Sequence, residues 1–435
     1  MEKLMDIAKK HADQVEIFSI DKTNKSLKYT NDIPKDLDYK KSSGISIRLI
    51  KDGKIGFAYT KNLRDRKQLV ENALKSLKGG VEAGFDFPLT KSIKNLDTYS
   101  DKINNISSEM MVKEAERITN KISSRGENET LAVVNASESS LRIINSAGSD
   151  LATKFSSYYA SGNIIMKGSA SSIGRMFVNK DFKKMPDKLL NEVLNLYNQS
   201  KNPVEPNGGK MKVLFMPSSS ITYLWRLLSG TSGENLYKKV TPLADKINEK
   251  VFSEKLTIYN DPTNDNLPGA RSFDDEGVKT KSYKLIDKGV FKKFYNNLNY
   301  AHKLDCEPTG NGFRSGMWGG DEVTLRPSPS VSHLRIQKGN SSFKDLISMM
   351  DKGIIVEGVL GAHSGNIPNG DYSVGMSPGI YVENGTIRGI AKDIMVAGNI
   401  YDTLKNIVAV GDTNYFGHGG YVPPLLCENV SVSNK

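Results

Sequence analysis

The sequence lacks several features that would place it in a specialised class. Only two cysteines occur among its 435 residues, Cys306 and Cys427, which is too few for a disulfide framework and suits a reducing compartment. No run approaches the roughly 18 consecutive apolar residues that a membrane-spanning helix needs. Residues 1–6 lack the basic and apolar segments of a secretory signal. We therefore expect a soluble protein of the cytoplasm.

The chain is basic overall, yet it contains no concentrated block of positive charge. Its 60 lysines and arginines against 49 acidic residues give a formal net charge of +11. The lysines are scattered among acids, as at Lys61, Lys67, Lys75 and Lys78. This dispersion favours a solvated lysine-rich surface over a dedicated nucleic-acid face. Polyanion binding stays open as the alternative, because a basic surface attracts phosphates.

Histidine is scarce, and its spacing excludes a zinc site carried on one helix. The five histidines are His11, His302, His333, His363 and His418. None has a second histidine four or five residues away, so no helix can present two imidazoles to one ion. The serines at 218–220 have no neighbouring base and are explained by helix capping. The residues alone predict neither a metal site nor a catalytic nucleophile.

The first part of the chain mixes helical and strand patterns. The dipeptide Asp52-Gly53 separates two alternating apolar runs, which predicts a hairpin because glycine accepts the positive φ of a tight turn. A helix is predicted to open at Ser107, where an apolar stripe of helical spacing begins. Residues 131–134 and 141–144 predict two short strands.

A domain boundary is predicted at residues 199–209, which combine proline, asparagine and glycine and follow no period. We therefore predict an N-terminal α/β domain, residues 1–200, and a mostly β domain, residues 210–435. The fold class is α+β. The second domain should open with a strand at 211–216 that turns into a helix at 221–228.

Two polar clusters in the second domain could carry a site. Asp274, Asp275 and Glu276 are consecutive acids that cannot all face one ion, so they indicate a turn, with a cation site as the alternative. Asn311 and Arg314 lie in a glycine-containing loop, where the guanidinium could bind a carboxylate or a carbonyl group. An ordinary surface arginine is the simpler interpretation.

These residues belong to a series of motifs that resembles the TldD/PmbA family of zinc metalloproteases, also described as modulators of DNA gyrase. The motifs keep the family's order from about residue 210 onward, at 261–262, 273–278, 301–304, 309–311, 350–356, 365–375, 380–385, 397–400 and 407–412. They are most similar to the PmbA branch, also called TldE.

The resemblance also identifies what this chain has lost. In the zinc-bearing branch, a helix after the first strand of the C-terminal domain holds HExxxH, and a late cysteine completes the site. Here the two histidines fall on Trp225 and Gly230, the glutamate falls on Arg226, and the cysteine falls near His418. These residues are unsuited to holding zinc. The PmbA branch shows the same loss, so the resemblance implies no metal and no catalytic residue in this chain.

The resemblance implies a cytoplasmic heterodimer in which a TldD-like subunit carries zinc and a PmbA-like subunit shapes a chamber for unfolded or leader peptides. A homodimer is the alternative assembly. We expect five residues to contribute to the peptide chamber: Asp274, Asp275, Glu276, Asn311 and Arg314. Two other functions stay open, a homodimeric peptidase that uses another catalytic group and a polyanion-binding or gyrase-modulating regulator.

Overall fold

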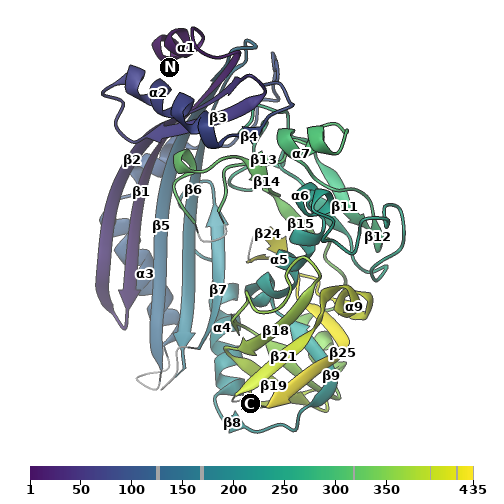
Figure 1. The fold of residues 1–435 in the computed structure, drawn as a ribbon. Coiled ribbons are helices and arrows are strands. Elements are labelled where there is room, and N and C mark those ends of the chain that lie inside the picture. The colour runs from purple at the N-terminus through teal and green to yellow at the C-terminus, as the bar shows by residue number, and fades with distance from the viewer. Residues whose placement is uncertain (124–127, 167–170, 317–318, 392, 418–419, 435) are drawn as a thin grey trace.

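The structure is a computed structural model that describes residues 1–123, 128–166, 171–316, 319–391, 393–417 and 420–434. Residues 14–179 hold one seven-stranded sheet in which all neighbouring strands are antiparallel (Figure 1). Its strands, in spatial order, are β4 (Val81–Glu82), β3 (Lys54–Thr60), β2 (Ile33–Lys51), β1 (Gln14–Thr30), β5 (Glu129–Asn145), β6 (Asp150–Ile165) and β7 (Ser172–Asn179).

The hairpin predicted at Asp52-Gly53 is confirmed. It joins β2 to β3, and the two turn residues have φ values of 50° and 69°. The two short strands predicted at 131–134 and 141–144 are wrong, because β5 runs unbroken through both. The residues between them belong to the same strand, and two of the polar ones, Ser137 and Ser139, line a cavity between the domains.

Helices cover parts of this sheet. They are α1 (Glu2–Ala8), α2 (Arg66–Ser76), α3 (Ser108–Ile122) and α4 (Asp187–Ser200), with short 3₁₀ turns η1 (Leu77–Gly79) and η2 (Asp101–Asn105). Helix α3 opens at the predicted cap, where the Ser107 hydroxyl accepts a hydrogen bond from the N–H group of Met110. Its buried stripe includes Met111, Ala115 and Ile118, and the helix packs on β1, β5 and β6.

The C-terminal part contains two larger sheets. The ten-stranded sheet runs β17 (Val359–Leu360), β18 (Asp371–Met376), β21 (Ile394–Asn399), β25 (Leu425–Asn434), β9 (Gly209–Phe215), β16 (Lys352–Val356), β19 (Gly379–Glu383), β20 (Thr386–Ala391) and β8 (Pro203–Val204), with β22 (Ile407–Val410) beside β25. The six-stranded sheet runs β12 (Val290–Phe291), β11 (Tyr283–Asp287), β10 (Ile258–Asn260), β15 (Leu334–Ile336), β24 (Gly420–Val422) and β23 (Tyr415–Gly417). Strands β13 (Gly312–Phe313) and β14 (Ser328–Pro329) form a small third sheet.

Short helices connect these strands. They are α5 (Ile221–Gly230), α6 (Gly233–Tyr237), α7 (Leu298–Lys303), α8 (Phe343–Ser348) and α9 (Ile400–Lys405), with 3₁₀ turns η3 (Pro217–Ser219) and η4 (Glu322–Thr324). The predicted α+β class with two domains is confirmed. In the described residues, no helix combines the length and the apolar character needed to cross a bilayer.

The two domains pack directly on each other. One apolar cluster joins Leu27 and Val134 of the N-terminal sheet, through α3 and α4, to Leu214, Ile355 and Leu426 of the ten-stranded sheet. Because the two domains share this interior, they lie against each other along a buried face. The side chains at that face therefore line any site between the domains.

Candidate functional site

Helix α5 is positioned by the strand before it. Strand β9 lies within the ten-stranded sheet, and the chain then turns through η3 into α5, as the sequence predicts for this place. The core-facing residues of the helix are at most 1% exposed: Tyr223, Leu224 and Leu227. Trp225, Arg226 and Gly230, the three residues expected at the degenerate zinc positions, all lie on this helix.

Arg226 is fully buried and binds four carbonyl groups. Its Nε donates to Asp371 O at 2.6 Å and its Nη1 to Thr222 O at 2.9 Å. Its Nη2 donates to Ala362 O at 3.1 Å and Ser364 O at 2.5 Å. No described carboxylate forms an ion pair with this guanidinium, and burial lowers its pKa. We call this arrangement the carbonyl clamp. It fastens α5 to the 362–371 segment.

Gly230, at the second histidine position, has no room for a side chain. A Cβ atom built there would lie 2.0 Å from Tyr401 Oη, which comes from α9. Real Cβ atoms do not approach a neighbour so closely, so any side chain at this position requires α9 or the tyrosine ring to move. As the helix stands, an imidazole does not fit here.

The residues at these positions do not fit a zinc ion. A buried guanidinium would repel a dication, an indole N–H is only a donor, and glycine offers no side-chain ligand. His418, the fourth expected position, lies outside the described residues. Within the described residues, no three His, Cys, Asp or Glu side chains gather in a way that could hold a metal ion.

A cavity of about 620 Å³ lies between the N-terminal sheet and the C-terminal domain. On the sheet side it is lined by two rows of side chains that lie opposite one another across strands β2, β1, β5 and β6. One row is Ser42, Lys22, Ser139 and Phe155, and the other is Lys40, Asn24, Ser137 and Ser157. We call these the polar rows. Seven of their eight side chains are polar, so this part of the sheet offers hydrogen bonds rather than an apolar face.

The opposite wall of the cavity comes from the C-terminal domain. It includes His333 before β15, Phe416 in β23 and Tyr421 in β24. His333 is 9% exposed, and its Nδ1 atom has no hydrogen-bond partner among the described residues. The Ser332 hydroxyl beside it is unpartnered in the same sense. Burial lowers the pKa of His333, which favours the neutral ring.

Of the five residues expected in the peptide chamber, two line a cavity and Asn311 is buried in the protein interior. Asp275 and Arg314 line a smaller cavity of about 280 Å³, which shares Phe155, Gly269 and Ser332 with the larger one. Asn311 is fully buried, and it accepts a hydrogen bond from Tyr283 Oη and donates one to Ser330 O.

The acidic cluster forms a closed turn in which each carboxylate has donors of its own. Asp274 accepts from the N–H groups of Glu276, Val278 and Gly312. Asp275 accepts from the N–H group of Arg314 and from the guanidinium of Arg271 at 2.7 Å. Burial raises the pKa of Asp274 well above its usual value, and the three N–H donors oppose that shift. The predicted turn is present, and its oxygens are occupied by protein donors.

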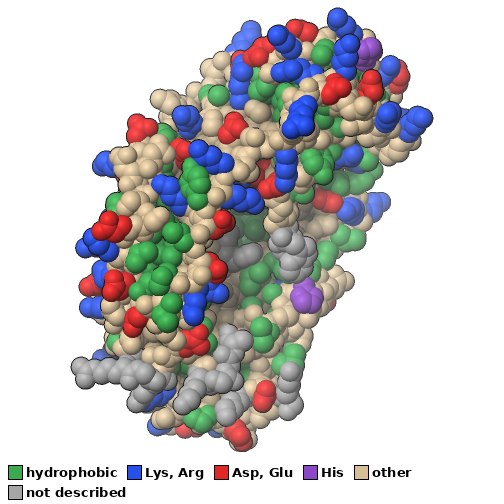
Figure 2. Space-filling model, turned by 90° about the vertical axis from the view of Figure 1, so that its left-hand side faces the viewer, with side chains coloured by type: hydrophobic (Ala, Val, Ile, Leu, Met, Phe, Trp, Pro, Cys, Tyr) green, Lys and Arg blue, Asp and Glu red, His purple; other side chains and the backbone are tan. Residues whose placement is uncertain are grey.

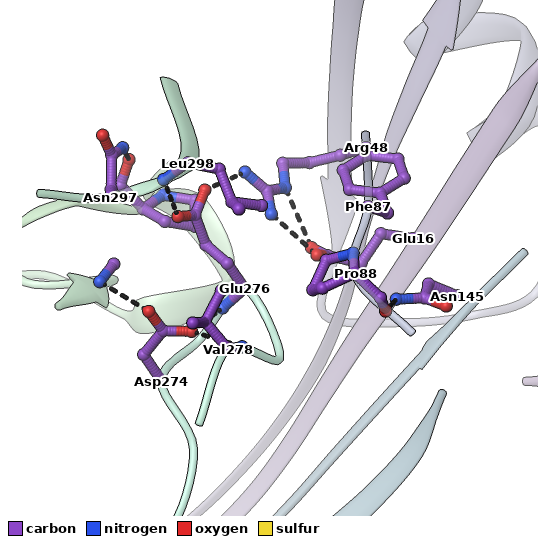
Figure 3. Close-up of polar contacts among 12 residues, drawn as sticks. Glu16, Arg48, Phe87, Pro88, Asn145, Asp274, Glu276, Val278, Asn297 and Leu298 are labelled. Carbon is purple, nitrogen blue, oxygen red and sulfur yellow. Dashed lines mark hydrogen bonds and ion pairs between the residues drawn. The ribbon is translucent and has the colours of Figure 1, made fainter. Parts of the chain in front are cut away.

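Glu276 faces the N-terminal domain rather than the turn. Figure 3 shows Arg48 of β2 between two carboxylates, Glu16 of β1 and Glu276. Arg48 Nη1 lies 2.8 Å from Glu276 Oε1, and its Nε and Nη2 bind both oxygens of Glu16 at 2.8 and 2.7 Å. Glu276 also accepts the N–H group of Leu298 at 2.7 Å. Arg314 completes the cluster 3.4 Å from Glu16, where burial lowers its pKa to about 10.

A second buried ion pair joins the domains. Arg175 of β7 binds Glu357, which follows β16, through both terminal nitrogens at 3.0 and 3.1 Å. Neither pair could be predicted from the sequence, since the members of each lie 182 or 228 residues apart. The polar rows were missed as well. The sequence pattern that could have indicated them is a series of small polar residues at alternate positions, such as Ser137 and Ser139, inside segments that otherwise have the composition of strands.

Comparisons with known protein families match most of the chain. Residues 208–434 match the PmbA/TldA metallopeptidase C-terminal domain, and residues 15–77 match the PmbA/TldA metallopeptidase domain 1. A metalloprotease of Methanothermobacter thermautotrophicus is 26% identical over 87% of this chain and 84% of its own length. A metalloprotease PmbA homologue of Buchnera aphidicola is 28% identical over 64% of each chain.

Solved structures show the same fold over the full length. TldE from Thermococcus kodakarensis superposes with a TM-score of 0.88, 25% identity and complete coverage of both chains. A Thermotoga maritima protein described as a modulator of a DNA gyrase superposes with a TM-score of 0.86, 25% identity and 99% coverage of both chains.

Proposed function

Because the chain belongs to the PmbA/TldD metallopeptidase family, we propose that it is the subunit of a cytoplasmic TldD/TldE-type protease that binds no metal itself. In this role it pairs with a zinc-bearing, TldD-like relative. It forms part of the wall of a chamber that takes unfolded or leader peptides. The partner supplies the hydrolytic ion, and this chain supplies binding surface.

The carbonyl clamp is the observation that carries this proposal. At the position where the zinc-bearing branch has its catalytic glutamate, Arg226 is committed to four backbone carbonyl groups. The position of the second histidine is unsuited to zinc as well, because Gly230 lies against Tyr401 and leaves no room for a side chain. A helix fixed in this way acts as a structural support for the segment at 362–371.

The cavity between the domains supports the peptide-binding part of the proposal. An extended peptide exposes N–H and C=O groups along its length, and it needs donors and acceptors on the surfaces that hold it. The polar rows provide hydroxyl, amide and ammonium groups on one wall. His333 and Ser332 provide unpartnered polar atoms on the other. Asp275 and Arg314 would close the inner end of this chamber.

The experiment is co-expression of this chain with a relative that retains HExxxH, followed by cleavage of an unstructured peptide. We expect the two chains to co-purify and to cut the peptide only when both are present, with cutting abolished by a chelator. Ser139→Trp should fill the chamber and reduce cleavage at least tenfold without changing the zinc content of the complex. Glu129→Trp, at an exposed position at the start of the same strand, is the matched control.

The proposal fails if this chain alone cleaves the peptide at the rate of the pair, because a second subunit would then be unnecessary. It also fails if Ser139→Trp and Glu129→Trp behave alike, because the peptide would then pass elsewhere.

A regulatory role on nucleic acid is the second candidate. It is motivated by the net charge of +11 and by the description of the Thermotoga maritima relative. Binding of that kind depends steeply on salt, since it releases counterions from phosphates. Retention on duplex DNA at low salt with loss at moderate salt would favour it, and absence of retention at low salt would dismiss it.

A further inference from the structure

Another cavity lies between helix α4 of the N-terminal domain and helix α8 and strand β20 of the C-terminal domain. Its volume is about 540 Å³, which is typical of small-molecule sites. We call it the α4–α8 cavity. In the part of the chain that the structure describes, it shares no lining residue with the cavity at the polar rows, although Tyr415 of the one and Phe416 of the other are neighbours in β23. The α4–α8 cavity is therefore distinct from the proposed peptide chamber.

The walls of the α4–α8 cavity bring apolar side chains together. They are Leu196 of α4, Phe343 and Ile347 of α8, and Ile387 of β20. All four belong to the apolar cluster that joins the two domains or pack against it. On the face of the molecule shown in Figure 2, by contrast, hydrophobic side chains lie among charged ones. A ligand with a carbon chain or a ring would bury apolar surface against these walls, which favours binding.

Three charged side chains also line the α4–α8 cavity: Arg175, Glu192 and Lys344. Arg175 donates through both terminal nitrogens to Glu357, at 3.0 and 3.1 Å. Its Nε atom lies 3.5 Å from Oε2 of Glu192, which is too long for a good hydrogen bond. Among the described residues, this Oε2 atom accepts no hydrogen bond. Glu192 is therefore a carboxylate whose capacity to accept hydrogen bonds is not filled.

The charges around Arg175 leave one carboxylate in excess. Arg175 is a single cation between Glu357 and Glu192, and Glu357 also accepts a hydrogen bond from the Ser218 hydroxyl. Lys344 is exposed and forms no ion pair within the described part of the chain. The Glu357 side chain is 1% exposed, whereas that of Glu192 is 25% exposed. Glu192 is therefore the carboxylate that a ligand can reach, and a positive charge beside it would balance the excess.

We propose that the α4–α8 cavity binds a small organic cation with an apolar body, such as an alkylamine, whose ammonium group lies at Glu192. The ammonium donates to the carboxylate, and the carbon chain lies along Leu196, Phe343 and Ile347. Hydrogen bonds between ionised partners are stronger than those between neutral ones. A carboxylate ligand of the same length would be repelled by Glu192 and Glu357, and an alcohol would leave the excess charge unbalanced.

The α4–α8 cavity suits a small amine better than it suits a segment of polypeptide. A polypeptide would bring backbone N–H and C=O groups against largely apolar walls, and burying such groups without hydrogen bonds is unfavourable. A small amine has one polar group, and the cavity has one reachable carboxylate for it. The inference does not depend on the proposed protease function, because binding of the amine needs neither zinc, nor a second chain, nor a peptide.

The test is isothermal titration calorimetry of the full chain at pH 7.5 with three probes of equal chain length: hexylamine, 1-hexanol and hexanoate. We expect hexylamine to bind saturably with one molecule per chain, and 1-hexanol and hexanoate to bind at least tenfold more weakly. Glu192→Gln keeps the size of the side chain and removes its charge. It should weaken hexylamine at least fivefold and leave 1-hexanol within twofold of its wild-type affinity, a selective change that a general folding defect would not produce.

A matched pair of variants locates the site. Asn195 and Asn198 are both exposed on α4, and of the two only Asn195 lines the cavity. Asn195→Trp should fill the cavity and weaken hexylamine at least tenfold, whereas Asn198→Trp should bind it as the wild type does. Circular dichroism and thermal unfolding check that each variant is folded.

Three results would overturn the proposal. The first is a wild-type chain that shows no saturable binding of hexylamine, or that binds hexanoate as tightly. The second is wild-type affinity for hexylamine in Glu192→Gln or in Asn195→Trp. The third is displacement of hexylamine by the unstructured peptide of the cleavage assay, because the cavity would then be part of the peptide path. All of these are measured on the single chain, so they do not depend on whether it assists a protease.

Discussion

Arg48 and Arg226 are both buried arginines, 3% and 0% exposed, but they lie in regions that treat the same charge differently. At the domain junction, Arg48 lies between the carboxylates of Glu16 and Glu276. In α5, Arg226 has only carbonyl oxygens around it. At the domain junction, opposite charges from the two domains form ion pairs. In α5, one guanidinium binds carbonyl groups of the helix itself and of the segment at 362–371.

The pKa values of the two guanidinium groups shift in opposite directions. The carboxylates raise the pKa of Arg48 against the opposing effect of burial, whereas burial lowers the pKa of Arg226. Partial charges on carbonyl oxygens stabilise a guanidinium less than full charges do. Removing Arg48 from the junction therefore leaves buried carboxylate charges without their cation. Removing Arg226 from the carbonyl clamp leaves carbonyl groups without hydrogen-bond donors.

The largest effect is expected for Arg48→Met. The change leaves Glu16 and Glu276 buried without their shared cation, and breaking a buried pair in this way costs about 3–5 kcal/mol. Urea denaturation would measure the loss in the free energy of unfolding. Arg142→Met, which removes a partly exposed pair with Asp150, should cost at most about 1 kcal/mol. Equal losses for the two variants would contradict a special role for the junction.

Arg226→Met should cost less, roughly 2–4 kcal/mol, because carbonyl groups lose their donors but no charge is stranded. The segment at 362–371 should also become sensitive to limited proteolysis, since the clamp holds it. Arg64→Met, at an exposed position, is the control and should leave both stability and cleavage unchanged. A clamp variant that keeps the protease resistance of the wild type would count against the role of Arg226 as a support.

A smaller effect is expected at Gly230. Gly230→Ala forces a methyl group against Tyr401 Oη and should cost about 1–3 kcal/mol, as overpacking in a core usually does. Tyr401→Phe removes that oxygen, so the double variant should recover most of the loss. Thermal unfolding of the two single variants and the double variant forms a cycle that measures the coupling. Strict additivity would show that the two positions do not meet as described.

The smallest effect concerns pH. Burial lowers the pKa of His333, so the unfolded chain, with an ordinary histidine pKa near 6.5, binds the proton more readily than the folded chain does. The free energy of unfolding should therefore fall as the pH is lowered through 6.5, by at most about 1.4 kcal/mol per pH unit. Urea denaturation at pH 7.5 and 5.5 should show a larger loss for the wild type than for His333→Asn. Parallel losses would contradict the buried, neutral histidine.

Local signals in the sequence were sufficient for several parts of the fold. Turn residues placed the hairpin at Asp52-Gly53, and helical spacing with a serine cap placed α3 at Ser107. Strand length was underestimated because β5 contains polar residues that the alternation rule reads as a break. Two of those residues, Ser137 and Ser139, face a cavity instead of the core, and the sequence does not indicate which surface a strand will face.

The site was predictable in position but not in chemistry. The resemblance located Trp225, Arg226 and Gly230 on one helix. It did not reveal that Arg226 binds carbonyl groups 136 to 145 residues away, because such partners are set by tertiary packing. The acidic cluster was predicted as a turn, and its function as a link between domains depends on Arg48, which lies 228 residues from Glu276.

In the proposed function, helix α5 serves as a structural support and holds no hydrolytic ion. The direct measurement is the metal content of the purified chain after incubation with zinc and removal of the excess, by mass spectrometry, beside a relative that retains HExxxH. We predict no stoichiometric zinc on this chain and full occupancy on the relative. One tightly retained zinc ion per chain, lost when Arg226 or Gly230 is altered, would contradict the account.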